Sequence, residues 1–296
     1  MRLAVHSAVF GTLTALVGCA AEPIVEVDNP PAAERKCGSR DVPADEAIAI
    51  ELSVPGDPVT SDFVEATFTI PVFTHVILDG NGAGDVTDAM IDAQIKVLND
   101  AYAGATGGAN MKMIFENAGV DRTTNAQWFH VSPGTAAERD MKSTLRQGGP
   151  ETLNMYTADL GGGLLGWATF PSDYADDPEV DGVVVLNTSL PGGGSAPFDE
   201  GDTATHEVGH WVGLFHTFQN GCSSPGDLVK DTPRVSDPNF GCPMAIDSCP
   251  SAAGDIPRPD LISNFMDYVD DSCMTAFTKG QSSRANRYYS RFRAGT

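Results

Sequence analysis

Apolar and polar positions begin to alternate near Thr67, where Phe68, Ile70 and Val72 are separated by smaller or polar residues. This two-residue period is typical of a β-strand with one buried face. Pro71 lies inside the run and favours an edge position or a break, because proline cannot donate to a strand ladder. Four further short strands are predicted, at Lys112–Glu116, Gln127–Val131, Leu164–Phe170 and Val183–Asn187.

The helical period first appears after Thr87, which is a suitable N-cap. Ile91, Ile95, Leu98 and Tyr102 then share one helical face. Two more helices are predicted near Ala136–Arg146 and Gly280–Arg293, and the chain between residue 216 and the last helix is irregular. These elements predict an α/β (α+β) fold, with a mixed sheet flanked by helices.

Residues 1–21 have the pattern of an export leader. Arg2 supplies the positive end, Leu3 to Val17 form the apolar core, and small residues follow. The apolar stretch is too short for a stable membrane span. Leu16 to Cys19 also resemble a lipobox, so two outcomes stay open: lipidation at Cys19, which anchors the protein at the cell surface, or simple cleavage and secretion.

Residues 22–60 are rich in Pro, Ala, Asp and Glu, and they predict a pro-segment or linker rather than part of a core. Residues 61–296 then form the main folded domain.

The charge is strongly acidic, with 18 Lys and Arg against 40 Asp and Glu and a net charge of −22. Nucleic acid and anionic membranes are therefore excluded as expected partners. The acids either solvate the surface or include groups that hold calcium or attract basic substrates.

Six cysteines are present. Cys19 belongs to the leader and Cys37 stands alone, whereas four cysteines cluster near the end, at Cys222, Cys242, Cys249 and Cys273. An even cluster in an exported protein indicates two disulfides, with three pairings open.

The strongest chemical signal is His206-Glu207-Val208-Gly209-His210, followed by Gly213 and His216. On a helix His206 and His210 share one face, so both imidazoles can reach one zinc ion. Glu207 points away from that face and can accept a proton from the attacking water. Gly213 permits the positive φ that ends the helix and brings His216 to the metal. Chance matching of the five fixed positions is on the order of 10⁻⁵, so an incidental histidine-bearing helix is disfavoured.

This signature resembles that of the metzincins, whose second hallmark is a methionine-containing turn. Asn264 to Tyr268 supply such a turn. Three more stretches narrow the resemblance to the pappalysin family, especially its small ulilysin-like members: Leu165–Pro171, Leu214–Gln219 and Asp231–Pro233. The resemblance extends from about residue 67 to the end. It implies a metzincin-type zinc protease domain, with a twisted mixed sheet, a backing helix and an active-site helix above an irregular C-terminal subdomain.

The resemblance also implies roles for individual residues. Met266 would form the hydrophobic base of the site, and Tyr268 would hydrogen-bond the metal or the oxyanion. The edge strand near Leu164–Phe170 would bind an extended peptide by strand addition. Calcium is implied as a second metal, with Asp227 and Asp231 as ligands, although exposed loop aspartates are often only solvated. The implied disulfide pairs are Cys222–Cys249 and Cys242–Cys273.

Together these observations predict a zinc endopeptidase that acts on extracellular proteins or peptides. Two alternatives are a surface binding protein with a structural zinc and a zinc hydrolase of non-peptide substrates. Glu207 disfavours the first, because a structural site gains nothing from a carboxylate beside an open coordination position. The long match around the methionine turn disfavours the second.

Two further predictions concern regulation and specificity. Cys37 precedes the catalytic domain, and its thiolate could occupy the water's position on zinc as a latency switch; the alternative is a spare cysteine. By the resemblance, Asp271 lies at the floor of the S1′ pocket and would select Arg or Lys directly after the scissile bond. Alternatively, Asp270 and Asp271 are simply solvated.

Overall fold

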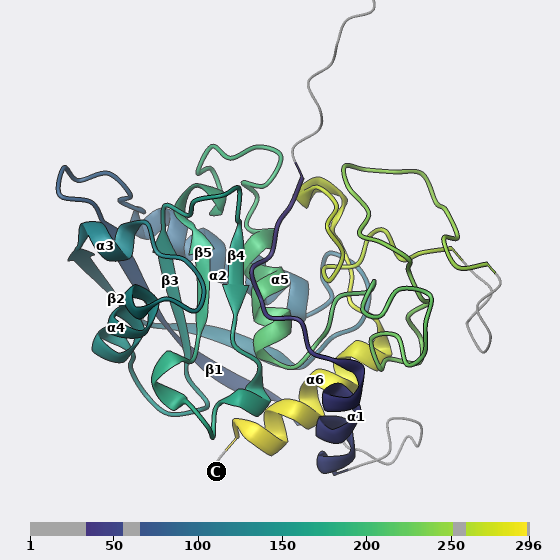
Figure 1. The fold of residues 1–296 in the computed structure, drawn as a ribbon. Coiled ribbons are helices and arrows are strands. Elements are labelled where there is room, and N and C mark those ends of the chain that lie inside the picture. The colour runs from purple at the N-terminus through teal and green to yellow at the C-terminus, as the bar shows by residue number, and fades with distance from the viewer. Residues whose placement is uncertain (1–33, 56–65, 251–258, 295–296) are drawn as a thin grey trace, which may run out of the picture. The chain divides into compact units, whose positions relative to one another are not determined.

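The computed structural model describes residues 34–55, 66–250 and 259–294. Its described part contains a five-stranded sheet in the order β2-β1-β3-β5-β4 (Figure 1). The first four strands in that order are parallel, whereas β4 pairs antiparallel with β5 and forms one edge. The strands are β1 (Phe68–Leu78), β2 (Met113–Thr124), β3 (Leu153–Ala158), β4 (Gly166–Ala168) and β5 (Val183–Leu186).

Helices cover both faces of this sheet, as predicted. The main core joins one face to α2 (Asp88–Tyr102) and α5 (Asp202–Trp211). A second core joins the other face to α3 (Ala126–Phe129) and α4 (Ala136–Leu145). Helix α6 (Lys279–Phe292) lies below α5 in Figure 1 and adds Ala285 and Tyr289 to the main core. Four short 3₁₀ turns complete the described elements: η1 (Pro171–Asp173), η2 (Pro178–Val180), η3 (Asn187–Ser189) and η4 (Asp271–Cys273).

The predicted helix cap is present, whereas Pro71 neither breaks its strand nor places it at an edge. The Thr87 side chain accepts a hydrogen bond from the Met90 amide at 3.2 Å and begins α2. Strand β1 is internal to the sheet, yet its pairing with β3 begins only at Val72. Pro71 therefore pairs with β2 alone, and its missing N–H does not interrupt a second ladder.

One prediction of secondary structure was wrong, and one strand was missed. Gln127–Val131 is not a strand, because the Asn125 side chain accepts from the amides of Gln127 and Trp128 and starts the short helix α3. Strand β3 was not predicted. All six of its residues are buried, so it lacks the alternation that marks a strand with one solvated face.

Residues 34–55 also depart from the prediction of a segment outside any core. They include a helix, α1 (Ala44–Ser53), and Val42, Ala47 and Val54 are buried. Val42 and Ala47 pack in a small cluster with Phe170 and Phe215 of the domain that follows. The leader, residues 1–21, and its Cys19 lie outside the described residues.

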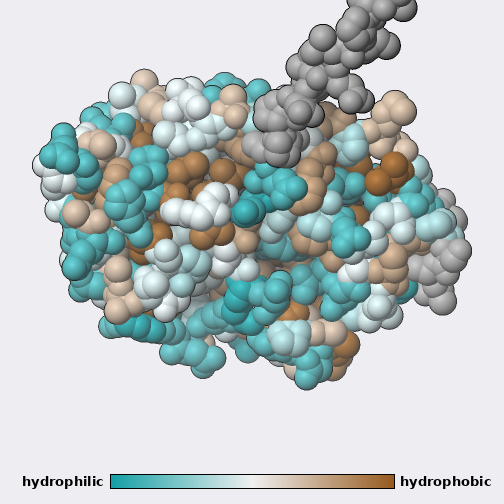
Figure 2. Space-filling model, turned by 45° about the horizontal axis from the view of Figure 1, so that its top comes forward, coloured by the Kyte–Doolittle hydropathy of each residue, from teal (hydrophilic) through white to brown (hydrophobic). Residues whose placement is uncertain are grey.

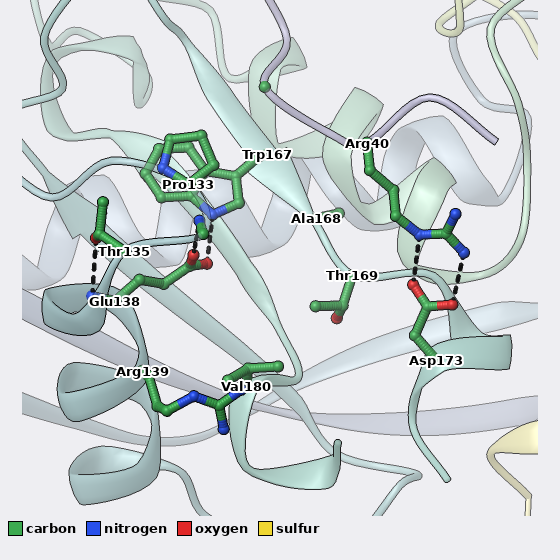
Figure 3. A pocket seen from close by; sticks show the side chains of 12 residues that line it. Arg40, Pro133, Thr135, Glu138, Arg139, Trp167, Ala168, Thr169, Asp173 and Val180 are labelled. Atoms are coloured by element: carbon green, nitrogen blue, oxygen red, sulfur yellow. Dashed lines mark hydrogen bonds and ion pairs between the residues drawn. The ribbon is translucent and has the colours of Figure 1, made fainter. Parts of the chain in front are cut away.

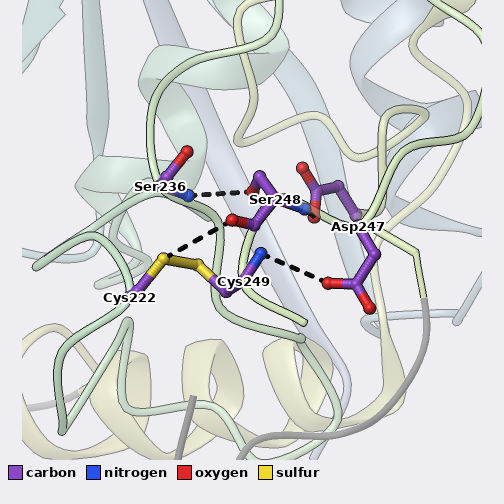
Figure 4. Close-up of a disulfide and its surroundings, with 6 residues drawn as sticks. Cys222, Ser236, Asp247, Ser248 and Cys249 are labelled. Carbon is purple, nitrogen blue, oxygen red and sulfur yellow. Dashed lines mark hydrogen bonds between the residues drawn. A yellow bond between two sulfur atoms is a disulfide. The ribbon is translucent and has the colours of Figure 1, made fainter. Parts of the chain in front are cut away.

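The chain after α5 has little regular structure, and disulfides cross-link it. Cys222 is bonded to Cys249 and Cys242 to Cys273, the pairing that the resemblance implies. Figure 4 shows the first of these beside Ser248, whose side chain accepts from the Ser236 amide at 3.0 Å. These bonds replace part of the stabilisation that a regular ladder would provide.

The described residues contain no helix that is both long and apolar enough to span a bilayer. Figure 2 shows hydrophilic and hydrophobic residues interspersed over one face of the molecule.

Candidate active site

Helix α5 carries the first two histidines of the signature. It begins after Gly201, whose φ of 101° turns the chain into the helix, and all ten of its residues are buried. The Nε2 atoms of His206 and His210 lie 3.2 Å apart, as expected for residues one turn apart on one face.

The third histidine reaches the same point through a turn. Gly213 has a φ of 102°, and a Cβ atom at this position would lie only 2.5 Å from the Tyr288 ring. Both the backbone and the space therefore require glycine. Beyond it, His216 brings its Nε2 to 3.0 Å from that of His210 and 3.2 Å from that of His206.

The chemistry of this donor set fits a divalent cation. The Nδ1 atoms of His206 and His210 donate to the carbonyls of Phe265 (2.7 Å) and Leu214 (2.8 Å), so their Nε2 atoms carry lone pairs. Burial lowers the pKa of all three imidazoles, that of His210 to about 4, and keeps them neutral. Converging lone pairs in a buried site are stable only around a cation, and three imidazole ligands suit zinc.

The methionine turn packs against α5. Met266 is fully buried, and a Cβ at Gly209 would meet its sulfur at 2.3 Å. The Met266 carbonyl accepts from the Thr217 amide at 3.2 Å, which ties the turn to the residue after His216. Gly209 thus allows the methionine to approach the helix between the two helical histidines.

Glu207 projects from the same helix toward the edge strand β4. Its Oε2 accepts from the Ser39 hydroxyl at 3.1 Å and from the Cys37 thiol at 3.3 Å. Burial raises the pKa of Glu207 to about 7, although these hydrogen bonds oppose the shift.

The partners of Glu207 belong to the N-terminal segment, which runs along β4. The Lys36 carbonyl accepts from the Leu165 amide (2.9 Å), and the Gly38 amide donates to the Gly166 carbonyl (2.7 Å). The pairing is parallel to β4. It brings the Cys37 sulfur into one cluster with the three histidines, all ligand atoms lying within 4.8 Å of one another. The edge strand therefore has an extended segment of the same chain beside it.

Tyr268 borders the same cluster. Its ring contacts those of His206 and His216 at centroid distances of 5.7 and 5.1 Å. Burial raises the pKa of its phenol further above 10, as do the nearby Cys37 and Glu207, so it remains a hydrogen-bond donor.

Comparisons with known proteins agree with this geometry. The family model described as "Pregnancy-associated plasma protein-A" matches residues 152–289. Extracellular metalloprotease 1 of Coccidioides posadasii is 41% identical over 273 residues, which cover 90% of this chain and 93% of that protein. An extracellular metalloprotease of Colletotrichum graminicola is 42% identical over 235 residues, 77% of this chain and 79% of that protein.

Solved structures from Tannerella forsythia match as well. A promirolysin mutant has a TM-score of 0.69 and 30% identity, covering 86% of this chain and 94% of its own. Mature mirolysin in complex with a cleaved peptide has a TM-score of 0.65 and 30% identity, and the match covers 78% of this chain and 97% of the mirolysin chain. This chain belongs to the pappalysin family. It is a metalloendopeptidase with the metzincin fold, so the binding-protein and non-peptide alternatives are not supported.

In this pappalysin Asp271 is not solvated. Its carboxylate is buried and pairs with the Arg35 guanidinium, while its second oxygen accepts from the Glu200 amide at 2.9 Å. Arg35 is 2% exposed; it also donates to the Val269 carbonyl (3.2 Å) and to the Thr203 hydroxyl (3.2 Å). Sequence reasoning missed Arg35 as the partner of Asp271. The available signal was its place two residues before Cys37.

Farther along the segment, Arg40 makes a second ion pair with Asp173, with contacts of 2.8 and 3.0 Å (Figure 3). The pair borders a cavity of about 220 Å³ that Trp167 of β4 and Glu138 of α4 also line. The Trp167 indole donates a hydrogen bond to the Glu138 carboxylate at 2.5 Å. Both ends of the stretch that runs along β4, Arg35 and Arg40, are therefore held by carboxylates of the catalytic domain.

The predicted calcium ligands lie away from this cluster and have protein partners. Asp227 accepts from the Val229 amide and the Thr232 hydroxyl, and burial raises its pKa to about 7. Asp231 accepts from the Thr278 hydroxyl and the Gly280 amide at the start of α6. Both carboxylates therefore accept hydrogen bonds from protein donors, and calcium binding by them stays a prediction.

Proposed function

We propose that this protein is the precursor of an exported zinc endopeptidase that prefers Arg or Lys directly after the scissile bond. One observation carries the proposal: three neutral imidazoles and the carboxylate of Glu207 meet beside an edge strand that pairs with an extended segment of the chain. Its relatives include proteins named extracellular metalloproteases, which supports export. Release and lipid anchoring at Cys19 both remain compatible with this proposal.

The roles of the residues follow from their positions. His206, His210 and His216 hold zinc, which when bound supplies a Lewis acid for the scissile carbonyl and lowers the pKa of the attacking water. Glu207 accepts the water's proton and passes it to the leaving amine; a pKa near neutrality suits both transfers. Tyr268 donates a hydrogen bond to the carbonyl oxygen as its negative charge develops.

Specificity is assigned to Asp271. Arg35 supports this role, because its buried guanidinium occupies the position that a basic substrate side chain would take. Thr203 and the Val269 carbonyl supply further acceptors, and the Phe198 ring lies 5.0 Å from the guanidinium. An acidic side chain would meet only an unpaired like charge there.

Latency is assigned to Cys37 and to residues 22–60 around it. The sulfur lies among the metal-binding histidines and against Glu207, so it would exclude the attacking water. Mirolysin is known both as promirolysin and as a mature form. This supports the proposal that the present chain, which is similar to mirolysin, is also a precursor. Calcium, with Asp227 and Asp231 as its ligands, is retained as a second proposed metal.

The test is digestion of casein by the purified protein with and without a zinc chelator. We expect hydrolysis that the chelator abolishes and added zinc restores. Mapping the cleaved bonds in a peptide library then tests the preference. A cleavage pattern without enrichment of Arg or Lys after the bond would refute the specificity while leaving the zinc mechanism intact.

A further inference from the structure

A second set of buried charges lies away from the zinc cluster, where α1 meets α6. The carboxylate of Glu51 accepts hydrogen bonds from Arg284, from Arg287 at 2.5 Å and from the Tyr288 hydroxyl at 2.8 Å. Both arginine side chains are at most 2% exposed. Three donors of one helix thus converge on a single acid of the N-terminal segment.

One of the donors, Arg284, is also held by contacts that do not involve Glu51. Arg284 donates to the Gly213 carbonyl and to the Tyr288 hydroxyl, each at 2.8 Å. Its guanidinium lies between two rings, 4.8 Å from the centroid of Phe215 and 4.2 Å from that of Tyr288. The site is therefore preorganised, and its main cation stays in place when the carboxylate leaves.

The chemistry of the donors suits an anion. Arg284 and Arg287 both donate to the Glu51 carboxylate, and removing the counter-charge of a buried cation is costly. Burial alone would raise the pKa of Glu51, but the charge of Arg284 and the hydrogen bonds from Arg287 and Tyr288 hold it below its usual value of 4.5. Paired guanidinium groups favour a carboxylate through charge-assisted hydrogen bonds.

The surface beside the donors is apolar. Phe215 and Phe170 form a small cluster with Ala47, and Ile50 and Leu228 pack against it. Ala47 lies one helical turn before Glu51, so one face of α1 presents the small apolar residue and the acid together. The site therefore suits a helix that carries an acidic side chain one turn after a small apolar residue.

We infer that Arg284, Arg287 and Tyr288 form a carboxylate-binding site of the catalytic domain, separate from the zinc site, whose ligand is the acidic side chain of a helical peptide. Glu51 fills it in the precursor, and residues 34–55 rebind there in trans after they are released. The second part rests on the proposed function, because it takes residues 22–60 as a removable pro-segment. Because Arg284 donates to the Gly213 carbonyl, the site also adjoins the turn between the proposed zinc ligands His210 and His216.

The site is tested first in the full-length chain carrying Glu207→Ala, so that no result depends on hydrolysis. In this background Glu51→Ala should lower the thermal unfolding midpoint. Sodium acetate should raise that midpoint by roughly 2–4 °C over sodium chloride at equal ionic strength, because a free carboxylate replaces the lost one. The matched control is Asp45→Ala, which removes an exposed acid from the same helix. Equal midpoints in acetate and chloride for Glu51→Ala would overturn the proposal.

If Glu51→Ala does not fold, Glu51→Gln retains the side-chain shape. Amide hydrogen exchange within α1 should then rise about tenfold, while Asp45→Asn leaves it unchanged. Equal exchange in the two variants would count against the site.

Rebinding is tested with the processed wild-type protein and a peptide of residues 34–55 carrying Cys37→Ser, which removes the thiol. Glu51→Gln in this peptide should weaken its binding about tenfold, and Asp45→Asn should not. Arg287→Gln in the protein should reduce the difference in affinity between the peptide that retains Glu51 and the Glu51→Gln peptide, with Arg284 and Tyr288 remaining as donors. Equal affinities, or no binding of either, refute rebinding. A chain that never hydrolyses casein refutes only the proposed function, since the acetate measurement needs no activity.

Discussion

The N-terminal segment is held by two regions of the catalytic domain that recognise it differently. Residues 35–40 are extended and contact groups assigned to chemistry or specificity, such as Glu207 and Asp271. Helix α1 instead packs on Phe170 and Phe215 and reaches α6 through Glu51. Changes in the first region should therefore alter catalysis and latency together, whereas changes at α1 should alter only how firmly the segment is held.

The largest expected effect separates chemistry from folding. Glu207→Ala should reduce casein hydrolysis by several orders of magnitude, because the proton acceptor is lost. Zinc content, measured by atomic absorption, and the thermal midpoint should stay near those of the wild type, since the carboxylate is not assigned as a ligand. A variant that digests casein at nearly the wild-type rate would contradict the mechanism.

Removing Asp271, the acid to which we assign specificity, should have the next largest effect. Asp271→Ala should lower kcat/KM for bonds before Arg or Lys about a hundredfold, because a buried cation would lose its partner. Asp270→Ala, its half-buried neighbour, is the matched control and should keep the preference. Library mapping that finds the same enrichment after Asp271→Ala would exclude this role.

The Cys37→Ala precursor should be several-fold more active than the wild-type precursor toward a reporter peptide. Without the sulfur, water has access to the metal-binding cluster. The measurement is the initial rate before any processing, followed by gel electrophoresis. Unchanged latency would reduce Cys37 to a spare cysteine and leave Arg35 as the main restraint of the extended region.

The smallest expected effect is the response of α1 to acid. The folded-state pKa of Glu51 is lowered, so its stabilising contribution is complete above the unfolded value of about 4.5 and is lost as the pH falls through the folded value. Hydrogen exchange of α1 should therefore rise more between pH 6 and pH 3.5 in the wild-type precursor than in Glu51→Gln. Parallel pH profiles of the two proteins would show that the ion pair does not hold the helix.

Helices α2, α4 and α6 and strand β5 were predicted close to their observed bounds, since each carries its own periodicity, cap or β-branched run. Strand β3 escaped prediction because burial of both faces removes alternation, and α3 because one Asn125 side chain outweighs a strand-like composition. The prediction of no core for residues 22–60 was wrong in its described part, because composition does not show which surface a segment will cover.

The sequence by itself determined the family and the histidine cluster of the signature. It implied the disulfide pairing only through the resemblance, since the cysteine count left three pairings open. The histidine signature and the methionine turn depend on helix spacing and one obligatory glycine, which are local properties that a motif can encode. Only the tertiary structure placed Arg35 against Asp271 and Glu51 against Arg284, pairs separated by 236 and 233 positions. In a chain with 40 acidic residues, no local pattern distinguishes a paired, buried carboxylate from a solvated one. Burial decides that difference, and burial is a property of the packed chain.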